Sequence, residues 1–263
     1  MQDQTTTTAG VEEWEMDMWR GISVCLLLCV LFSAVQPRAD TTASEDEIAL
    51  ALANMLRAGR TVIAEKQSVI NDPGTGKGLT GETVRDDAIR IYREKTGTDP
   101  DDIIAHNPYG KLLAIQIDAI TEVLDDHQST INKAGIGFKG FVPAVFARLV
   151  NERFRDKIGS EADVKVTAPV NLVRNRKALP DPWEVEVITS QLSSGDWPKD
   201  RIFSQLAVKN GRPAYRVLVP EYYSQNCLSC HGEPAGEIDI TGYPKEGGHL
   251  GQLGGVISIS LFR

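Results

Sequence analysis

The stretch Arg201–His231, RIFSQLAVKNGRPAYRVLVPEYYSQNCLSCH, contains the clearest local structural signals in the chain. Two largely apolar runs, Arg201–Lys209 and Arg212–Pro220, flank the dipeptide Asn210-Gly211. Both residues of this dipeptide tolerate a positive φ, which a two-residue turn between antiparallel strands requires. The stretch therefore predicts a β-hairpin, and it ends on a short cysteine-containing motif.

The motif Cys227-Leu228-Ser229-Cys230-His231 places two thiols three positions apart, with a histidine directly after the second. This spacing is typical of a c-type haem attachment site. Each thiol adds to one haem vinyl group to form a thioether, and the short turn brings His231 beneath the iron as an axial ligand. Haem supplies redox or gas-binding chemistry, and the chain supplies ligation, orientation and burial. We expect Cys227, Cys230 and His231 to bind covalent haem c and its iron.

Other interpretations of the two thiols stay open at this point. A structural zinc site usually has four protein ligands, commonly from two such clusters. The remaining cysteines, Cys25 and Cys29, lie in an apolar N-terminal run. The rest of the chain therefore has no second pair of cysteines that could complete a zinc site. A redox-active CxxC dithiol or a disulfide is the other alternative.

That apolar run is Gly21–Val35, GISVCLLLCVLFSAV. It is short for a membrane-spanning helix of about 20 apolar residues, and it suits the hydrophobic region of a signal peptide. We expect either cleavage after Ala39 or retention of residues 21–35 as an inner-membrane anchor. Both alternatives export the rest of the chain, which agrees with haem attachment outside the bacterial inner membrane. We therefore expect a periplasmic protein.

The composition excludes some functions. The formal charge of −8 and the pI near 5.1 argue against nucleic acid as a partner, because nucleic-acid binding relies on clustered Lys and Arg. Apart from the haem motif we find no catalytic constellation, since the adjacent carboxylates Asp125 and Asp126 lie near the end of an expected helix. We expect a protein that is not an enzyme.

Apolar residues at helical spacing predict four helices in the first part of the chain. The first follows Ser44-Glu45-Asp46-Glu47, which has the pattern of a capping box. The third is expected to begin with Asn107 as N-cap and Pro108 at the first helical position. The helices are expected near residues 44–70, 81–95, 107–127 and 142–154.

Strand patterns dominate the later part of the chain. Besides the hairpin, we expect a strand near Val164–Val170, a short helix from Pro180 to about Leu192, and a final strand over Gly254–Phe262. Helices followed by an antiparallel sheet indicate an α+β fold with N-terminal amphipathic helices.

Several short blocks in the second half of the chain follow one another in a fixed order. They are Arg174-Asn175-Arg176, Ala178-Leu179-Pro180-Asp181-Pro182-Trp183-Glu184, Gly211-Arg212-Pro213-Ala214-Tyr215, Cys227–His231 and Gly254-Gly255-Val256-Ile257-Ser258-Ile259-Ser260. Together they resemble the exported PAS-like domains that carry one c-type haem and often serve as bacterial sensor modules. This resemblance implies a PAS-like antiparallel sheet that carries haem at its edge through Cys227, Cys230 and His231. Arg176 departs from the family signature, which has proline there, and this puts the local loop shape in question.

The resemblance also suggests how the chain is divided. We expect an N-terminal extension with a signal peptide or membrane anchor over residues 1–39. A helical lead-in over residues 40–140 and a PAS-like c-type haem domain over residues 141–263 follow it.

The second axial ligand decides whether the iron has an open site. His127, on an apolar helical stripe, and His106, near a helix start, are the main candidates; Met55 and His249 are further ones, and an open or water-bound site is the alternative.

Two further groups of side chains are candidates for contact with haem, with ordinary structural roles as the alternative. They are Arg174 and Arg176 for the haem propionates, and Tyr222, Tyr223 and Trp183 for the porphyrin.

We expect a periplasmic c-type haem protein that acts as a redox- or gas-responsive, sensor-like module. The alternative is a small monohaem electron-transfer cytochrome. Either function requires a redox or signalling partner protein. The first helix is also a candidate surface for a homodimer, although packing on its own domain explains its apolar stripe equally well.

Overall fold

The structure is a computed structural model that describes residues 38–263, with side chains from residue 42 onward. The expected signal peptide or anchor at residues 21–35, together with Cys25 and Cys29, lies outside the described residues. Residues Thr42–Arg263 form one compact unit. No helix within the described part of the chain is long and apolar enough to cross a membrane.

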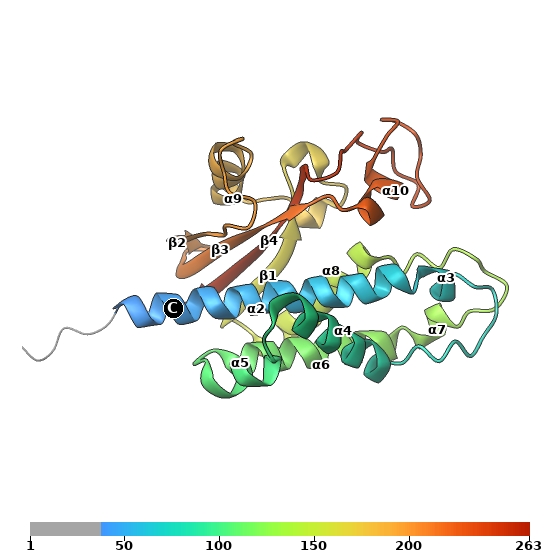
Figure 1. Cartoon of the computed structure of the whole chain (residues 1–263), viewed down its shortest axis with the longest axis horizontal. Coiled ribbons are helices and arrows are strands. Elements are labelled where there is room, and N and C mark those ends of the chain that lie inside the picture. Colours follow the sequence, from blue (N-terminus) through green and yellow to red (C-terminus); the bar gives the residue numbers. More distant parts are fainter. Residues whose placement is uncertain (1–37) are drawn as a thin grey trace, which may run out of the picture. The chain divides into compact units, whose positions relative to one another are not determined.

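Helices make up the first half of this unit (Figure 1). Thr80 caps α4 through a reciprocal pair of hydrogen bonds with Thr83, and Gly97 ends it in the left-handed region with φ 69°. The long helices are α2 (Arg38–Glu65), α4 (Gly81–Thr96), α6 (Gly110–Asp126) and α8 (Pro143–Ile158); the short ones are α3 (Gln67–Ile70), α5 (Pro100–His106) and α7 (Gln128–Ile131).

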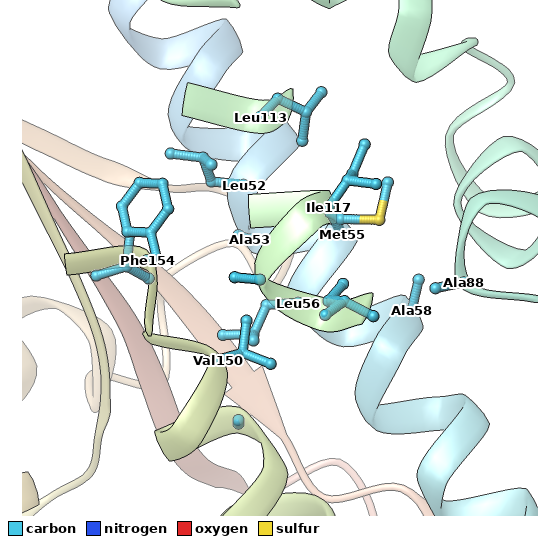
Figure 2. Close-up of a cluster of buried hydrophobic side chains, with 14 of the residues drawn as sticks. Leu52, Ala53, Met55, Leu56, Ala58, Ala88, Leu113, Ile117, Val150 and Phe154 are labelled. Carbon is cyan, nitrogen blue, oxygen red and sulfur yellow. The ribbon is translucent and has the colours of Figure 1, made fainter. Parts of the chain in front are cut away.

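The helical core is closely packed. Figure 2 shows Leu52, Met55 and Leu56 of α2 beside side chains of α6 and α8, and all three are fully buried. Burying a side chain of this size contributes about 1.5–3 kcal/mol. Gly59 permits the close approach of α8, because a Cβ atom there would lie 2.9 Å from the ring of Phe146.

The second half of the unit is built on an antiparallel sheet. Its strands are β1 (Ala162–Thr167), β2 (Phe203–Lys209), β3 (Arg212–Tyr222) and β4 (Leu253–Phe262), in the order β1-β4-β3-β2. The expected hairpin is confirmed: Asn210 and Gly211 form its turn with φ values of 52° and 76°. The α+β fold is confirmed as well.

The sheet has a different layer on each face, because side chains alternate along a strand (Figure 1). Val217, Val219 and the matching residues of β4 join the core of the long helices. Leu218 and Val256 instead form a second core with α9 (Pro182–Val187) and the following π-helical turn η3 (Ile188–Leu192). The short helix expected near residues 180–192 is thus confirmed.

The block PDPWE encloses a buried charge cluster on this second face. Asp181 and Glu184 form a capping box at the start of α9. Arg216 of β3 donates from Nη2 to Asp181 at 2.5 Å and to Glu184 at 3.3 Å, and Trp183 lies over its guanidinium at 4.1 Å. Ser258 also donates to Glu184 at 2.6 Å. The block therefore holds α9 onto the sheet, and Trp183 has this structural role.

Two of the expected helix starts are wrong. α2 begins at Arg38, so Ser44-Glu45-Asp46-Glu47 lies inside the helix and is not a capping box. Asn107 ends α5 instead of starting a helix, and α6 begins at Gly110. The earlier pair Asp99-Pro100 supplies the N-cap and first position of α5. The Nδ2 group of the buried Asn107 side chain donates to the Ser44 carbonyl and to Glu47, while its Oδ1 accepts a hydrogen bond from the Tyr109 N–H at 2.8 Å.

Helix α2 is joined to the helix-facing side of the sheet by polar contacts. The Tyr215 hydroxyl donates to Asp46 at 2.8 Å, and Arg263 pairs with the buried Glu45 at 2.7 Å. Arg57 and Arg60 both bind Glu221 near the end of β3, at 2.5 Å and 2.6 Å. The helices and the sheet share one core, and the boundary that we expect near residue 140 stays a prediction.

Candidate haem site

The loop between β3 and β4, residues 224–252, carries the cysteine motif. The strand pairing continues past a register shift at Glu221/Tyr222. The Tyr223 N–H donates to the Gln252 carbonyl at 2.9 Å, and the Gly251 N–H donates to the Tyr223 carbonyl at 2.8 Å. Both ends of the loop are therefore fixed to the two central strands of the sheet.

The motif forms one short helical turn. Cys227 ends the 3-10 turn η4 (Gln225–Cys227), and Cys230 and His231 lie in α10 (Leu228–His231). Both thiols are free and partly exposed. Cys227 Sγ lies 3.3 Å from the Ser224 hydroxyl. The turn thus brings together the two thiols and the histidine that the sequence predicts as the haem site.

The imidazole of His231 is held on two sides. Its Nδ1 lies 2.8 Å from Glu246 Oε2, and its ring stacks on Tyr223 with centroids 5.3 Å apart and planes 19° apart. A carboxylate only accepts hydrogen bonds, so Nδ1 carries the proton and donates it. In the neutral imidazole the other ring nitrogen, Nε2, then has the lone pair that a metal ligand needs.

Two glycines make room for the Tyr223 ring. A Cβ atom at Gly254 would lie 2.2 Å from this ring, and one at Gly248 would lie 2.4 Å from it. The Gly248 N–H also donates to the His231 carbonyl at 2.7 Å. Burial, together with the nearby charge of Glu246, raises the pKa of Tyr223 to about 12, so the phenol stays neutral.

Arg174 organises the surroundings of the motif. Its guanidinium donates to both oxygens of Glu246, at 2.6 Å and 2.9 Å, to Asp239 at 2.6 Å and to the Cys230 carbonyl at 2.8 Å. Burial opposes its charge, but these carboxylates outweigh that effect and raise its pKa. Arg174 is a candidate for contact with a haem propionate, which stays a prediction; in the structure its donors bind the loop that carries the motif.

Asp239 fixes the far part of the same loop. One carboxylate oxygen accepts hydrogen bonds from the Thr241 N–H at 2.7 Å, the Thr241 hydroxyl at 2.6 Å and the Tyr243 N–H at 3.2 Å. Burial favours the protonated acid, but these bonds and Arg174 hold the pKa of Asp239 well below its ordinary value. The Asp239 carboxylate therefore holds this part of the loop together by hydrogen bonds within the loop and by an ion pair with Arg174 outside it.

The other side chains that are candidates for contact with haem have protein surroundings of their own. Arg176 lies in the exposed 3-10 turn η2 (Arg176–Ala178), just after the turn η1 (Val170–Leu172). Trp183 belongs to the buried charge cluster, and the ring of Tyr222 faces the Lys199 ammonium at 5.5 Å. Of the aromatic candidates, only Tyr223 contacts His231 in the described structure.

The candidate second ligands have contacts of their own. His127 Nδ1 lies 2.8 Å from the Val123 carbonyl, and its ring lies against Phe141. His106 Nδ1 lies 2.9 Å from the Asp102 carbonyl, and Figure 1 shows its helix α5 far from α10. Met55 is fully buried in the helical core (Figure 2), and His249 is exposed in the motif loop. A ligand role for His127 or His106 stays a prediction.

The residues present fit a covalently held haem. Two free thiols and an imidazole whose Nδ1 is already hydrogen-bonded, which leaves Nε2 for a metal, are the groups that a covalently held haem needs from the chain. Within residues 42–263, no cluster of three or more His, Cys, Asp or Glu side chains is arranged to hold a metal ion. Porphyrin supplies four iron ligands itself, so haem does not require such a cluster.

These features define a class of protein: an α+β domain whose Cys227–His231 motif lies in the loop between two sheet strands. The sequence model of the Tll0287-like family, Tll0287, matches residues 38–261, and the chain belongs to this family. The match supports the resemblance to cytochrome-like and sensor-like haem domains in broad terms. Searches of curated proteins and of solved structures gave no match.

Sequence reasoning missed Glu246 and Asp239. Each is an isolated acidic residue in a Gly- and Pro-containing loop, where exposed carboxylates are common. Their shared partner Arg174 lies 65 and 72 positions earlier in the sequence. The one available signal was that Arg174 belongs to an ordered block of the resemblance, where only the haem propionates were considered as its partner.

Proposed function

We propose that the chain is an exported c-type haem protein that acts as a redox- or ligand-responsive, sensor-like module and is not an enzyme. The observation that supports it best is the turn Cys227–His231, where two free thiols adjoin an imidazole already held in the metal-binding tautomer. Cys227 and Cys230 would hold haem through thioethers, and His231 would bind its iron through Nε2. When bound, haem supplies one-electron chemistry and ligand binding.

The residues around the motif have distinct tasks in this proposal. Glu246 keeps the proton on Nδ1, Tyr223 supports one face of the imidazole, and Arg174 fixes both Glu246 and the carbonyl of Cys230. Such preorganisation reduces the rotamer freedom that binding would otherwise remove. A ligand-responsive module also requires a site on the iron that is open or that holds an exchangeable ligand.

A second candidate function is electron transfer to a protein partner. The motif loop exposes several large apolar side chains, and such groups favour contact with another protein. Electron transfer would require a firm second axial ligand, and His127 remains the first to test. The exposed side chains are Ile238, Ile240, Tyr243 and Leu250, which are 63%, 66%, 46% and 66% exposed.

The spectrum with carbon monoxide separates these two functions. The full chain is produced with the cytochrome c maturation machinery, reduced, and exposed to the gas. We expect the reduced spectrum to change, because the iron of a gas sensor either has an open coordination site or releases a ligand that the gas replaces. A low-spin spectrum that carbon monoxide leaves unchanged would support the electron carrier and exclude the gas sensor. His127→Ala and His106→Ala variants would then identify or eliminate these ligands.

A further inference from the structure

We infer that Glu246 is a positioning residue for the iron ligand: it orients His231 and makes its imidazole a stronger electron donor. This inference rests on the proposed haem function. Glu246 Oε2 lies 2.8 Å from His231 Nδ1, and the carboxylate is 15 residues further along the chain. No neighbouring backbone carbonyl takes this place in the described hydrogen bonds of His231.

The carboxylate is fixed before any ligand arrives. Arg174 donates from Nε to Oε1 at 2.6 Å and from Nη2 to Oε2 at 2.9 Å. Oε2 therefore accepts from both Arg174 and His231. Because the guanidinium binds both oxygens, the carboxylate cannot rotate away without breaking a two-point, charge-assisted contact.

This arrangement has a chemical consequence at the metal. A carboxylate that accepts the Nδ1 proton increases the basicity of the imidazole, and such outer partners tune the metal that the imidazole binds. A more basic ligand stabilises ferric over ferrous iron. Glu246 therefore lowers the reduction potential of the bound haem, and its loss raises that potential.

The first test compares two carboxylates of the same loop. Glu246→Gln removes the charge beside His231, whereas Glu237→Gln removes a charge that pairs only with Lys245, at 3.3 Å, in the described contacts. We expect Glu246→Gln to favour the reduced state roughly tenfold, which is about 59 mV for a one-electron couple, and Glu237→Gln to change it less than threefold. Equal shifts in the two variants would overturn the inference.

A second test does not require haem. In the haem-free full chain, nitrogen NMR of His231 above the ordinary imidazole pKa reports which ring nitrogen carries the proton. We expect Nδ1–H in the wild type and in Glu246→Asp, and a shift toward Nε2–H in Glu246→Ala. An Nε2–H wild type would contradict the inference. If haem does not attach at all, the proposed function fails, while this measurement still decides the role of Glu246.

Discussion

At the scale of single residues, Gly254 determines how closely Tyr223 approaches β4. We predict that Gly254→Ala destabilises the protein, because the added Cβ would lie 2.2 Å from the Tyr223 ring. Overpacking of this kind costs about 1–3 kcal/mol. Urea denaturation followed by circular dichroism measures the loss, and the His231 ring signals should shift in the same variant.

Gly195→Ala is the matched control for this substitution. Nothing lies within 4 Å of a Cβ at Gly195, so we expect no loss of stability there. If both variants unfold at the same urea concentration, the close approach of Tyr223 does not constrain Gly254.

The residues of the motif itself could be predicted from the sequence, because Cys227, Cys230 and His231 are local to one turn. Their supports could not. Glu246 contacts His231 across 15 positions of the chain, and Arg174 contacts Glu246 across 72 positions. Neither residue has a local pattern that points to its partner. The tautomer of His231 follows from this tertiary contact alone.

At the scale of elements, β3 carries two arginines with very different surroundings. We predict that Arg216→Ala lowers the free energy of unfolding by about 3–5 kcal/mol, because it leaves the fully buried Glu184 with one fewer cationic partner. Arg212→Ala on the same strand removes an exposed contact with the Ser160 carbonyl and should cost far less. Urea denaturation of both variants checks the difference, and similar losses would show that the buried cluster does not hold α9.

Acid should weaken the edge of the sheet through Asp163 of β1. Burial raises the pKa of Asp163, but Lys209 at 2.5 Å and Arg155 at 2.7 Å outweigh this and hold it below its ordinary value. The stabilisation is present above the pKa of the unfolded acid, about 3.9, and is lost as the pH falls through the lower folded value.

The measurement is the urea midpoint as the pH is lowered from 7 to 3. We predict a falling midpoint for the wild type and a flatter dependence for Asp163→Asn, which cannot lose that charge. Identical slopes for the two proteins would assign the acid sensitivity to other carboxylates, such as Asp181, whose pKa Arg216 also lowers against the effect of burial.

The elements differ in how far the sequence predicts them. The β2–β3 hairpin follows from Asn210-Gly211, since the turn needs positive φ values that these residues accept. The junction of α5 and α6 does not, because Asn107-Pro108 has the local pattern of a helix start. The Asn107 Oδ1 accepts the Tyr109 N–H as the pattern suggests, but residues 107–109 form a turn and regular helix begins only at Gly110. The tertiary hydrogen bonds from Asn107 Nδ2 to α2 have no signal in the local sequence.

At the scale of the whole described unit, Glu221 joins the long helix α2 to the strand that leads into the motif. Arg57 also donates to the Pro220 carbonyl at 2.8 Å, so three contacts meet at this point. We predict that Glu221→Ala costs about 1–3 kcal/mol, since charge-assisted hydrogen bonds are lost and both Arg57 and Arg60 lose their carboxylate partner. Amide exchange near Arg57 and Arg60 should also accelerate.

Glu152→Ala is the control for this link, because Glu152 pairs only with Arg148 within α8 among the described contacts. A surface pair of this kind contributes about 0–1 kcal/mol. If Glu221→Ala is no more disruptive than Glu152→Ala, the contact between α2 and β3 is not a structural connection of importance.

The pyridine haemochrome spectrum tests most directly the central claim that Cys227 and Cys230 hold haem covalently and that His231 binds its iron. The full chain and a Cys227→Ser, Cys230→Ser variant are produced with the cytochrome c maturation machinery and extracted with acidified acetone. We predict a c-type spectrum that stays with the wild-type protein after extraction, and no retained haem in the double variant. A wild-type protein without haem, or a double variant that keeps it after extraction, would contradict the claim.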